Sequence, residues 1–232
     1  MAVAESRSTG SAIPREDSRA IDVRHVGTLD YEDGLALQKK LVEARRAREI
    51  GDTLLLLEHP PVITLGVKTR GGSANIVAPA EELEAKGVSV FETGRGGDVT
   101  YHGPGQLVGY PILDLRPDRC DVHRYVRDLE SVLIVAVREF GIDAGRVDGL
   151  TGVWVGESGR EEKLAAIGVR ISRWITSHGF ALNVATDLGH FGLIVPCGIT
   201  DRGVTSLERL VGHSVPMADV QAAVVRGFKE VF

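Results

Sequence analysis

The stretch Val153–Val184, VWVGESGREEKLAAIGVRISRWITSHGFALNV, decides the fold class of this chain. Within it, Val153–Val155 and Lys163–Ile171 are rich in apolar and β-branched residues, which is typical of strands. Glu157–Arg160 lies between them and predicts the turn of a hairpin. His178–Val184 predicts a further strand. Successive strands without a helical pattern between them argue against a regular array of β-α-β units.

The remaining elements follow from hydrophobic period, turn residues and helix caps. Pro111 lacks an N–H, so its strand is expected at a sheet edge or at a bulge. Helices lie between the strands irregularly, so the predicted fold is α+β (mixed α/β), a central mixed β-sheet flanked by helices. Further strands are expected at Ile21–Val26, Thr53–Glu58, Val62–Leu65, Val88–Glu92 and Gln106–Leu115, and helices from Asp30 to about Ile50, from Pro79 to Gly87, from Asp121 to Phe140 and over Val215–Phe232.

Composition limits the class of protein. The 232 residues, 43% hydrophobic and 25% charged, fit one domain with a sizeable core, expected over residues 21–232. Residues 1–20 lack the apolar stretch of a secretory signal and are expected to form a disordered extension. The net charge of −5 gives no support for nucleic-acid binding, and no apolar run is long enough to span a bilayer. The two cysteines are too few for a disulfide framework, which favours a cytoplasmic location.

A glycine-rich segment, Gly94–Gln106 (GRGGDVTYHGPGQ), carries a dense set of polar side chains. Glycine lets backbone N–H groups approach a ligand closely, and polar residues among the glycines favour a binding loop. The spacing fits neither a P-loop nor a dinucleotide-binding fingerprint. Its N–H groups could instead hold an acyl oxygen that gains negative charge during a reaction. A tight connection between strands, with glycines present for steric reasons, is the alternative.

Cys197, between a proline and a glycine, is the candidate nucleophile. The neighbours leave little bulk around its sulfur, and an exposed thiol with a lowered pKa is reactive. A buried, inert cysteine is the alternative. Lys163 matters if its ammonium faces this sulfur, because a nearby cation favours the thiolate. A dyad of the cysteine with His102 or His178 is the generic alternative for nucleophilic catalysis.

Four blocks occur in a fixed order: Arg95–Gln106, Lys163 with Ala166–Arg170, His178–Asn183, and the Pro-Cys-Gly around Cys197. Together they resemble the octanoyltransferase family, also called the lipoate–protein ligase B family or lipoyl(octanoyl) transferases, over about residues 21 to 232. Phe180 is a mild departure from it, because leucine is more usual there. The resemblance implies a catalytic domain with the fold of the biotin and lipoate protein ligases.

The resemblance also implies an activity. An octanoyl group moves from octanoyl-acyl carrier protein to a specific lysine of lipoyl domains, in 2-oxoacid dehydrogenase complexes and in the glycine cleavage H protein, as the first step of endogenous protein lipoylation. Cys197 is then the nucleophile that carries the acyl-thioester, and Lys163 lowers its pKa and serves as acid and base. Neither cofactor nor metal is implied, no nucleic acid or membrane is a partner, and a monomer is expected. The residues that match the family's substrate contacts are Arg95, Gly96, Gly97, Asp98, Val99, Thr100, Tyr101, His102, Ala166, Ile167, Gly168, Gly179, Phe180 and Ala181.

Three other functions stay open. An ATP-dependent lipoate or biotin ligase of the same fold would need the lysine but no nucleophilic cysteine. A cysteine thioesterase would pair Cys197 with a histidine and release free acid. A non-catalytic protein that binds acyl groups or lipoyl domains would leave the cysteine inert. Docking of acidic partners predicts a basic face, for which the candidates are Arg45, Arg46 and Arg48 or Arg170 and Arg173.

Overall fold

The structure, a computed structural model, describes residues 20–69, 75–195 and 202–232, so Cys197 and nearly all of the predicted N-terminal extension lie outside the described residues. The helices are α1 (Tyr31–Arg46), α2 (Ala80–Ala85), α3 (Val122–Arg138), α4 (Leu207–Val211) and α5 (Met217–Val231), with short 3-10 segments η1 (Val67–Thr69) and η2 (Leu188–Leu193). The strands are β1 (Asp22–Thr28), β2 (Thr53–Glu58), β3 (Val62–Leu65), β4 (Ser89–Glu92), β5 (Val99–His102), β6 (Gln106–Ile112), β7 (Gly145–Val147), β8 (Leu150–Val155), β9 (Glu162–Ser172) and β10 (Ile175–Asn183).

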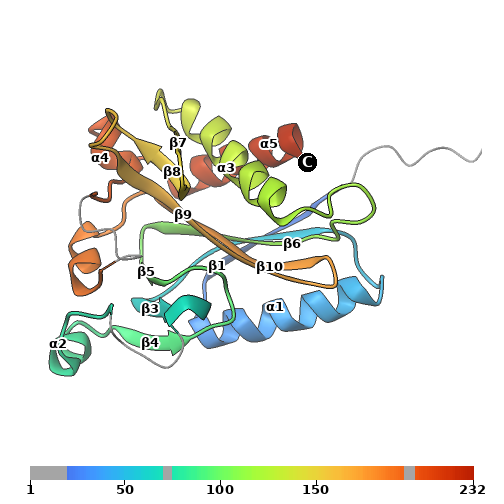
Figure 1. Ribbon diagram of the computed structural model, residues 1–232, viewed down its shortest axis with the longest axis horizontal. Coiled ribbons are helices and arrows are strands. Elements are labelled where there is room, and N and C mark those ends of the chain that lie inside the picture. The colour runs from blue at the N-terminus through green and yellow to red at the C-terminus, as the bar shows by residue number, and fades with distance from the viewer. Residues whose placement is uncertain (1–19, 70–74, 196–201) are drawn as a thin grey trace, which may run out of the picture.

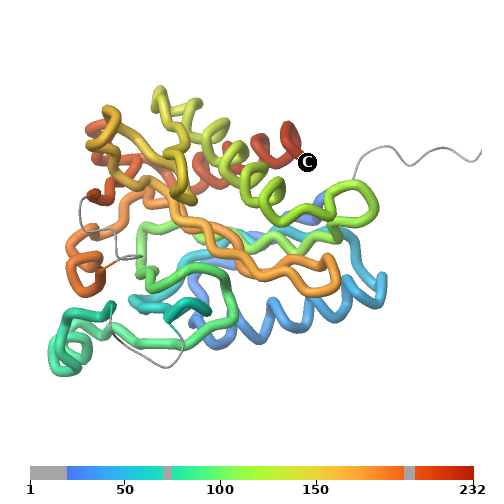
Figure 2. The backbone as a smooth tube through the Cα atoms, viewed as in Figure 1, coloured from blue at the N-terminus to red at the C-terminus, as the bar shows by residue number. Residues whose placement is uncertain are grey.

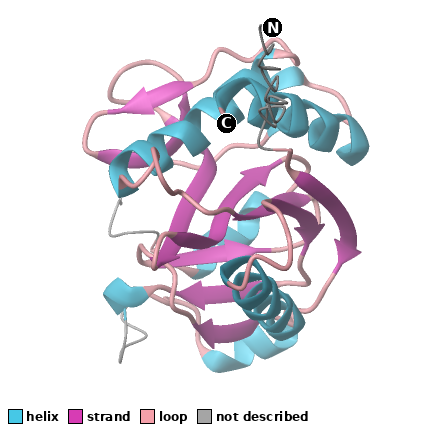
Figure 3. Ribbon diagram, turned by 90° about the vertical axis from the view of Figure 1, so that its right-hand side faces the viewer, coloured by secondary structure: helices cyan, strands magenta, loops and turns pink. Residues whose placement is uncertain are grey.

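Two sheets form the centre of the molecule. The larger has seven strands in the order β1-β2-β6-β10-β9-β8-β7, and it is mixed because β1 and β2 are parallel while the other pairs are antiparallel. The smaller has the order β4-β3-β5. Figure 1 shows α1 on one face of the large sheet and α3 with α5 on the other, and Figure 3 shows the layers from the side. This architecture confirms the predicted α+β fold.

Strand β2 serves two cores at once, which explains its continuous apolar sequence. Leu54 and Leu56 pack in the cluster that contains α3 and α5, while Leu55 and Leu57 pack with residues of α1. Successive side chains of a strand point to opposite faces, so a strand covered on both sides is apolar throughout. Figure 2 shows these covering layers as the red C-terminal helix on one side of the sheet and the blue α1 on the other.

The strand that carries Pro111 lies inside the large sheet, so of the two predicted settings, a sheet edge or a bulge, the edge is wrong. β6 pairs with β2 on one side and with β10 on the other, and Pro111 is opposite Leu54 of β2. On the β10 side the described register ends at Gly109 and Phe180, so no ladder bond requires an N–H from Pro111 there. His178, two residues before Phe180 on β10, has a left-handed φ of 55°. A local irregularity between two central strands therefore accommodates the proline.

Other boundaries also differ from the sequence-based expectation. α1 ends at Arg46 rather than near Ile50, and Arg48 has a left-handed φ of 61° that ends helical geometry. The glycine-rich segment contains strand β5, which completes the small sheet. Strand β7 and helix α4 are too short to leave a periodic signal in the sequence. Among residues 20–69, 75–195 and 202–232, no helix is long and apolar enough to cross a membrane.

Candidate active site

A cavity of about 470 Å³ lies where the glycine-rich segment meets β9 and β10. Small-molecule sites typically measure roughly 300–1,000 Å³. Lys163 lines this cavity, as do all the predicted substrate-contact residues except Tyr101. Tyr101 lies instead in the core of the small sheet, where its ring stacks on His190 with centroids 4.9 Å apart. The structure therefore brings together blocks that are far apart in the sequence.

Antiparallel pairing of β9 with β10 explains why two of these blocks meet. Ala166, Ile167 and Gly168 are directly opposite Ala181, Phe180 and Gly179. The glycine-rich segment then packs across β9, because the Gly96 N–H donates to Val169 O over 2.8 Å. A Cβ on Gly168 would lie 2.8 Å from Gly96 O, so glycine is required for this close approach.

Arg95 holds the glycine-rich segment on the small sheet. Its side chain is buried, and its guanidinium donates to Thr64 O over 2.6 Å, to Thr64 Oγ1 and to Gly96 O. Asp98 fixes the next turn, because its carboxylate accepts from Asn75 Nδ2 and from the Val99 N–H. Several predicted contact residues therefore shape the wall of the cavity through bonds within the chain.

Lys163 lies between β8 and a short segment at residues 203–205. Its backbone N–H donates to Gly203 O, and its carbonyl accepts from the Thr205 N–H, so both backbone groups point toward that segment. On its other side Lys163 is opposite Trp154 of β8, and its Nζ lies 4.7 Å from the centroid of the indole ring. This arrangement is a cation–π contact at the cavity wall.

The cavity has an apolar part lined by residues that the sequence does not identify. Val122 and Val126 come from α3, and Leu150 and Trp154 from β8. Phe180 lines the same cavity, and its ring lies against Gly109 so closely that a Cβ there would overlap it. An apolar wall of this kind suits a hydrocarbon chain.

Three imidazoles lie near one end of the cavity. Burial lowers the pKa of His102 to about 3 and that of His178 to about 4, with Arg95 contributing to both shifts. Burial also lowers the pKa of His59, whose Nε2 is 2.7 Å from the Tyr110 hydroxyl. His102 and His178 line the cavity and are neutral at physiological pH. Of the groups missed from sequence, Tyr31, Lys68, Tyr110 and Arg202 also line it.

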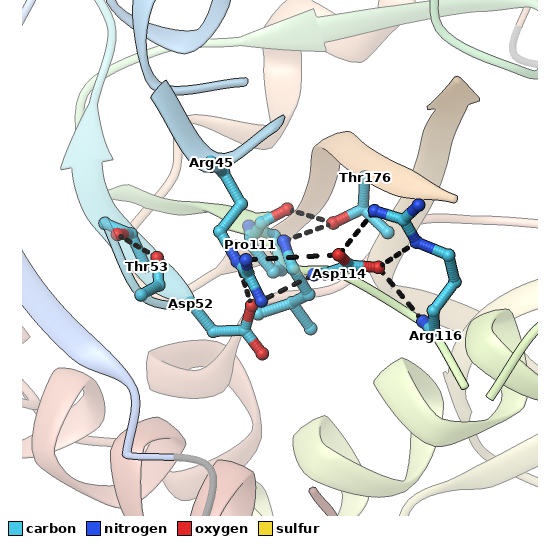
Figure 4. A network of polar contacts seen from close by, with 9 residues as sticks. Arg45, Asp52, Thr53, Pro111, Asp114, Arg116 and Thr176 are labelled. Carbon is cyan, nitrogen blue, oxygen red and sulfur yellow. Dashed lines mark hydrogen bonds and ion pairs between the residues drawn. The ribbon is translucent and has the colours of Figure 1, made fainter. Parts of the chain in front are cut away.

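One arginine of the predicted basic face at the end of α1 is engaged within the fold. Arg45 donates to Asp52 over 2.7 Å and lies 3.9 Å from Asp114, as Figure 4 shows. Asp52 also accepts the Asp114 N–H, and Asp114 pairs with Arg116. These bonds tie α1 to the sheet. Arg45 therefore has a structural role, whereas the candidates for a docking surface that remain exposed are Arg46, Arg48, Arg170 and Arg173.

The proposed nucleophile, Cys197, lies in the segment 196–201, outside the described residues. The chain enters that segment after Val195, whose N–H donates to Asn75 O. It leaves the segment at Arg202, which lines the cavity and contacts Glu161. Cys120, the other cysteine, is exposed and lies before α3.

Sequence comparisons identify similar proteins over most of the chain. The family described as lipoyl protein ligase A/B catalytic domain matches residues 30–229. An octanoyltransferase from Myxococcus xanthus is 54% identical over 214 residues, which cover 91% of this chain and 59% of that protein. One from Caldicellulosiruptor saccharolyticus is 52% identical over 214 residues, which cover 91% of this chain and 88% of that protein. The chain thus spans less than two thirds of the first relative and most of the second.

Structural comparisons confirm the predicted architecture. A bipartite lipoate protein ligase from Thermoplasma acidophilum has a TM-score of 0.69 at 18% identity, covering 91% of this chain and 84% of that one. A biotin protein ligase from Aquifex aeolicus, in complex with biotin and ATP, has a TM-score of 0.54 at 14% identity, covering 90% and 69%. At these identities the likeness concerns the fold alone.

Proposed function

This chain belongs to the lipoyl protein ligase A/B catalytic-domain family, and within it to the octanoyltransferases, and on that premise we propose that it moves an octanoyl group from acyl carrier protein to a lysine of lipoyl domains. Cys197 carries the group as a thioester, and Lys163 is the acid and base. The acceptors are the lipoyl domains of 2-oxoacid dehydrogenase complexes and the glycine cleavage H protein.

One observation carries the proposal: a single cavity joins Lys163 to the glycine-rich segment and to an apolar wall. The apolar part suits an octanoyl chain, and burying each methylene contributes about 0.8 kcal/mol. The glycine-rich segment borders the same space, and in this proposal one of its backbone N–H groups holds the oxyanion that forms at the acyl carbon. The residues proposed to bind substrate are those named above on the sequence, with Tyr101 acting through the core of the small sheet.

The chemistry proceeds in two balanced steps. The Cys197 thiolate attacks the donor thioester, a new C–S bond forms, and the carrier protein's thiolate leaves. The amine of the acceptor lysine then attacks the enzyme thioester, an amide forms, and the Cys197 thiolate leaves. Lys163, as an ammonium, stabilises the thiolate before acylation and gives its proton to the carrier protein's thiolate as that thiolate leaves. As a neutral amine it takes the proton that the attacking nitrogen loses.

Two alternative functions, a cysteine thioesterase and an ATP-dependent ligase, make different demands on the residues of this cavity. A thioesterase would need a histidine to act as general base toward water. His102 and His178 both line the cavity, but burial holds the pKa of each well below neutral, which weakens both as bases. An ATP-dependent ligase shares the fold and would bind its acyl group in the same cavity. It would activate free octanoate with ATP and would not require Cys197.

Intact-mass measurement after incubation with octanoyl-acyl carrier protein tests the proposal. We expect the protein to gain one octanoyl group and to lose it when a lipoyl domain is added. Cys197→Ser should remove this adduct, while Cys120→Ser, the matched control, should keep it. Transfer of free octanoate that needs ATP and survives Cys197→Ser would instead identify a ligase, and release of free acid without an acceptor would identify a thioesterase.

A further inference from the structure

A chain of buried hydrogen bonds connects the glycine-rich segment to the short segment beside Lys163. His102 Nδ1 lies 2.7 Å from Gln106 Oε1, and Gln106 Nε2 donates to Asn183 Oδ1 over 2.9 Å. Asn183 Nδ2 in turn donates to Thr205 O over 3.0 Å. The side chains of His102, Gln106 and Asn183 are all buried. Breaking one bond would therefore leave an unsatisfied polar group away from water.

The donor and acceptor of every hydrogen bond in this series follow from its final acceptor, Thr205 O. Thr205 O is a carbonyl and can only accept, so the Asn183 amide must point its NH2 group toward it. Asn183 Oδ1 then accepts from Gln106 Nε2, which also donates to Tyr101 O over 3.2 Å. Gln106 Oε1 is left to accept, so His102 carries its proton on Nδ1. The low pKa of His102 agrees with this neutral form.

Thr205 is also the residue that holds Lys163 in place. The Thr205 N–H donates to Lys163 O, and Lys163 N–H donates to Gly203 O. The 203–205 segment therefore lies between Lys163 on one side and Asn183 on the other. On the neighbouring strand β8, Lys163 is opposite Trp154, and the ammonium of the lysine lies over the indole ring. The angle at which Lys163 enters the cavity depends on both neighbours.

We infer that Gln106 and Asn183 form a positioning pair, which fixes Lys163 at the cavity by holding the 203–205 segment against its backbone. The inference rests on the proposed function only in that Lys163 is the acid and base of the reaction. Neither amide needs to touch the substrate for this role. Loss of the pair allows the 203–205 segment to shift, and Lys163 with it, and a displacement of about 1 Å at a reacting group can lower a rate by about 10²-fold.

Variants with a matched control separate this role from a general structural one. Asn183→Leu removes the central amide and Gln106→Leu removes its neighbour. Thr176→Val is the control, because Thr176 is also fully buried on β10 and bonds to Leu113 N and Pro111 O, near the opposite end of that strand. We expect similar losses of thermal stability in all three, a fall in kcat for octanoyl transfer of about 10²-fold in the first two only, and little change in KM.

Tryptophan emission gives a readout that does not need activity. The chain has two tryptophans, so a Trp174→Phe background leaves Trp154 as the single reporter beneath the Lys163 ammonium. We expect Asn183→Leu and Gln106→Leu to shift its emission in the same direction as Lys163→Met, while Thr176→Val leaves it unchanged. Unchanged emission with kinetics equal to those of the control would overturn the inference. Full transfer activity in Lys163→Met would refute the proposed function instead, and emission would still decide on positioning.

Discussion

Phe180 offers a direct test of the proposal that this cavity binds the acyl chain. Phe180 lines the cavity, and its ring rests on Gly109 in the neighbouring strand and lies 6.4 Å from the ring of Phe228, so the ring has little room to move. Phe180→Ala removes this wall without altering the backbone pairing of β10. We expect the variant to accept longer acyl chains than the parent protein.

The size of the effect follows from buried area. Two further methylenes, each contributing about 0.8 kcal/mol, give about 1.6 kcal/mol, or roughly a 15-fold change in preference for decanoyl over octanoyl donors. The same substitution should lower the free energy of unfolding by about 3–5 kcal/mol, because it leaves a space in the core. Saturating decanoyl donor should restore part of this loss, since the longer chain occupies that space.

Competition between octanoyl and decanoyl thioester donors, read as the masses of the acylated protein, measures the preference. Leu182→Ala is the matched control, because Leu182 is also a fully buried residue of β10 but does not line the cavity. Its stability should fall by about 2–5 kcal/mol with no change in preference. A folded Phe180→Ala protein whose preference equals that of Leu182→Ala would refute the reasoning.

Three further substitutions test the loop, the imidazoles and the α1 network. Gly168→Ala should displace the glycine-rich segment, because the added Cβ would lie 2.8 Å from Gly96 O, and the rate of transfer at saturating donor should fall. Gly51→Ala is the control, because a Cβ there would have no atom within 4 Å, and equal transfer rates in the two variants would contradict the prediction. His178 has a folded pKa of about 4 against 6.5, so the unfolded state binds its proton more tightly and stability is lost as pH falls from 6.5 toward 4. The gap between urea midpoints at about pH 7.5 and pH 5 should narrow in His178→Phe, with His102 and His59 keeping the remainder, and an unchanged gap would count against this reasoning. Asp52→Ala should lower the free energy of unfolding by about 1–3 kcal/mol, because it leaves Arg45 Nε and the Asp114 N–H without their acceptor. The activity per folded molecule should not change, and a loss of that activity would link this network to the site.

Local sequence signals were sufficient for much of the fold. The apolar run Thr53–Glu58 and the two prolines after His59 predict β2 and β3 with the observed bounds, because burial and proline act locally. The hairpin of β8 and β9 follows from its turn residues in the same way. The position of Pro111 could not be predicted, since whether a strand is central depends on pairing with segments far along the chain.

The candidate site, like the fold, could be predicted from the sequence only in part. The motif blocks predict most residues of the cavity, and the hairpin register alone would have placed Trp154 opposite Lys163. Val126 has no comparable signal, because it reaches the cavity only when α3 packs on the large sheet. Tyr101, although inside the strongest motif, alternates to the core side of β5. Motif membership therefore does not distinguish a residue that touches the ligand from one that supports its neighbours.

Strand β9 gives the protein little freedom to change one property at a time. It holds Lys163 at its start, forms the apolar wall through Ile167, and bonds the glycine-rich segment through Val169 O. Residues that share one rigid element and common partners have non-additive effects when substituted. A mutation on β9 that widens the wall is therefore expected also to move the lysine or the glycine-rich segment. Evolution of a new acyl preference should therefore proceed through paired, epistatic substitutions on β9 and the glycine-rich segment, and single replacements on this strand should mostly lower activity toward every chain length.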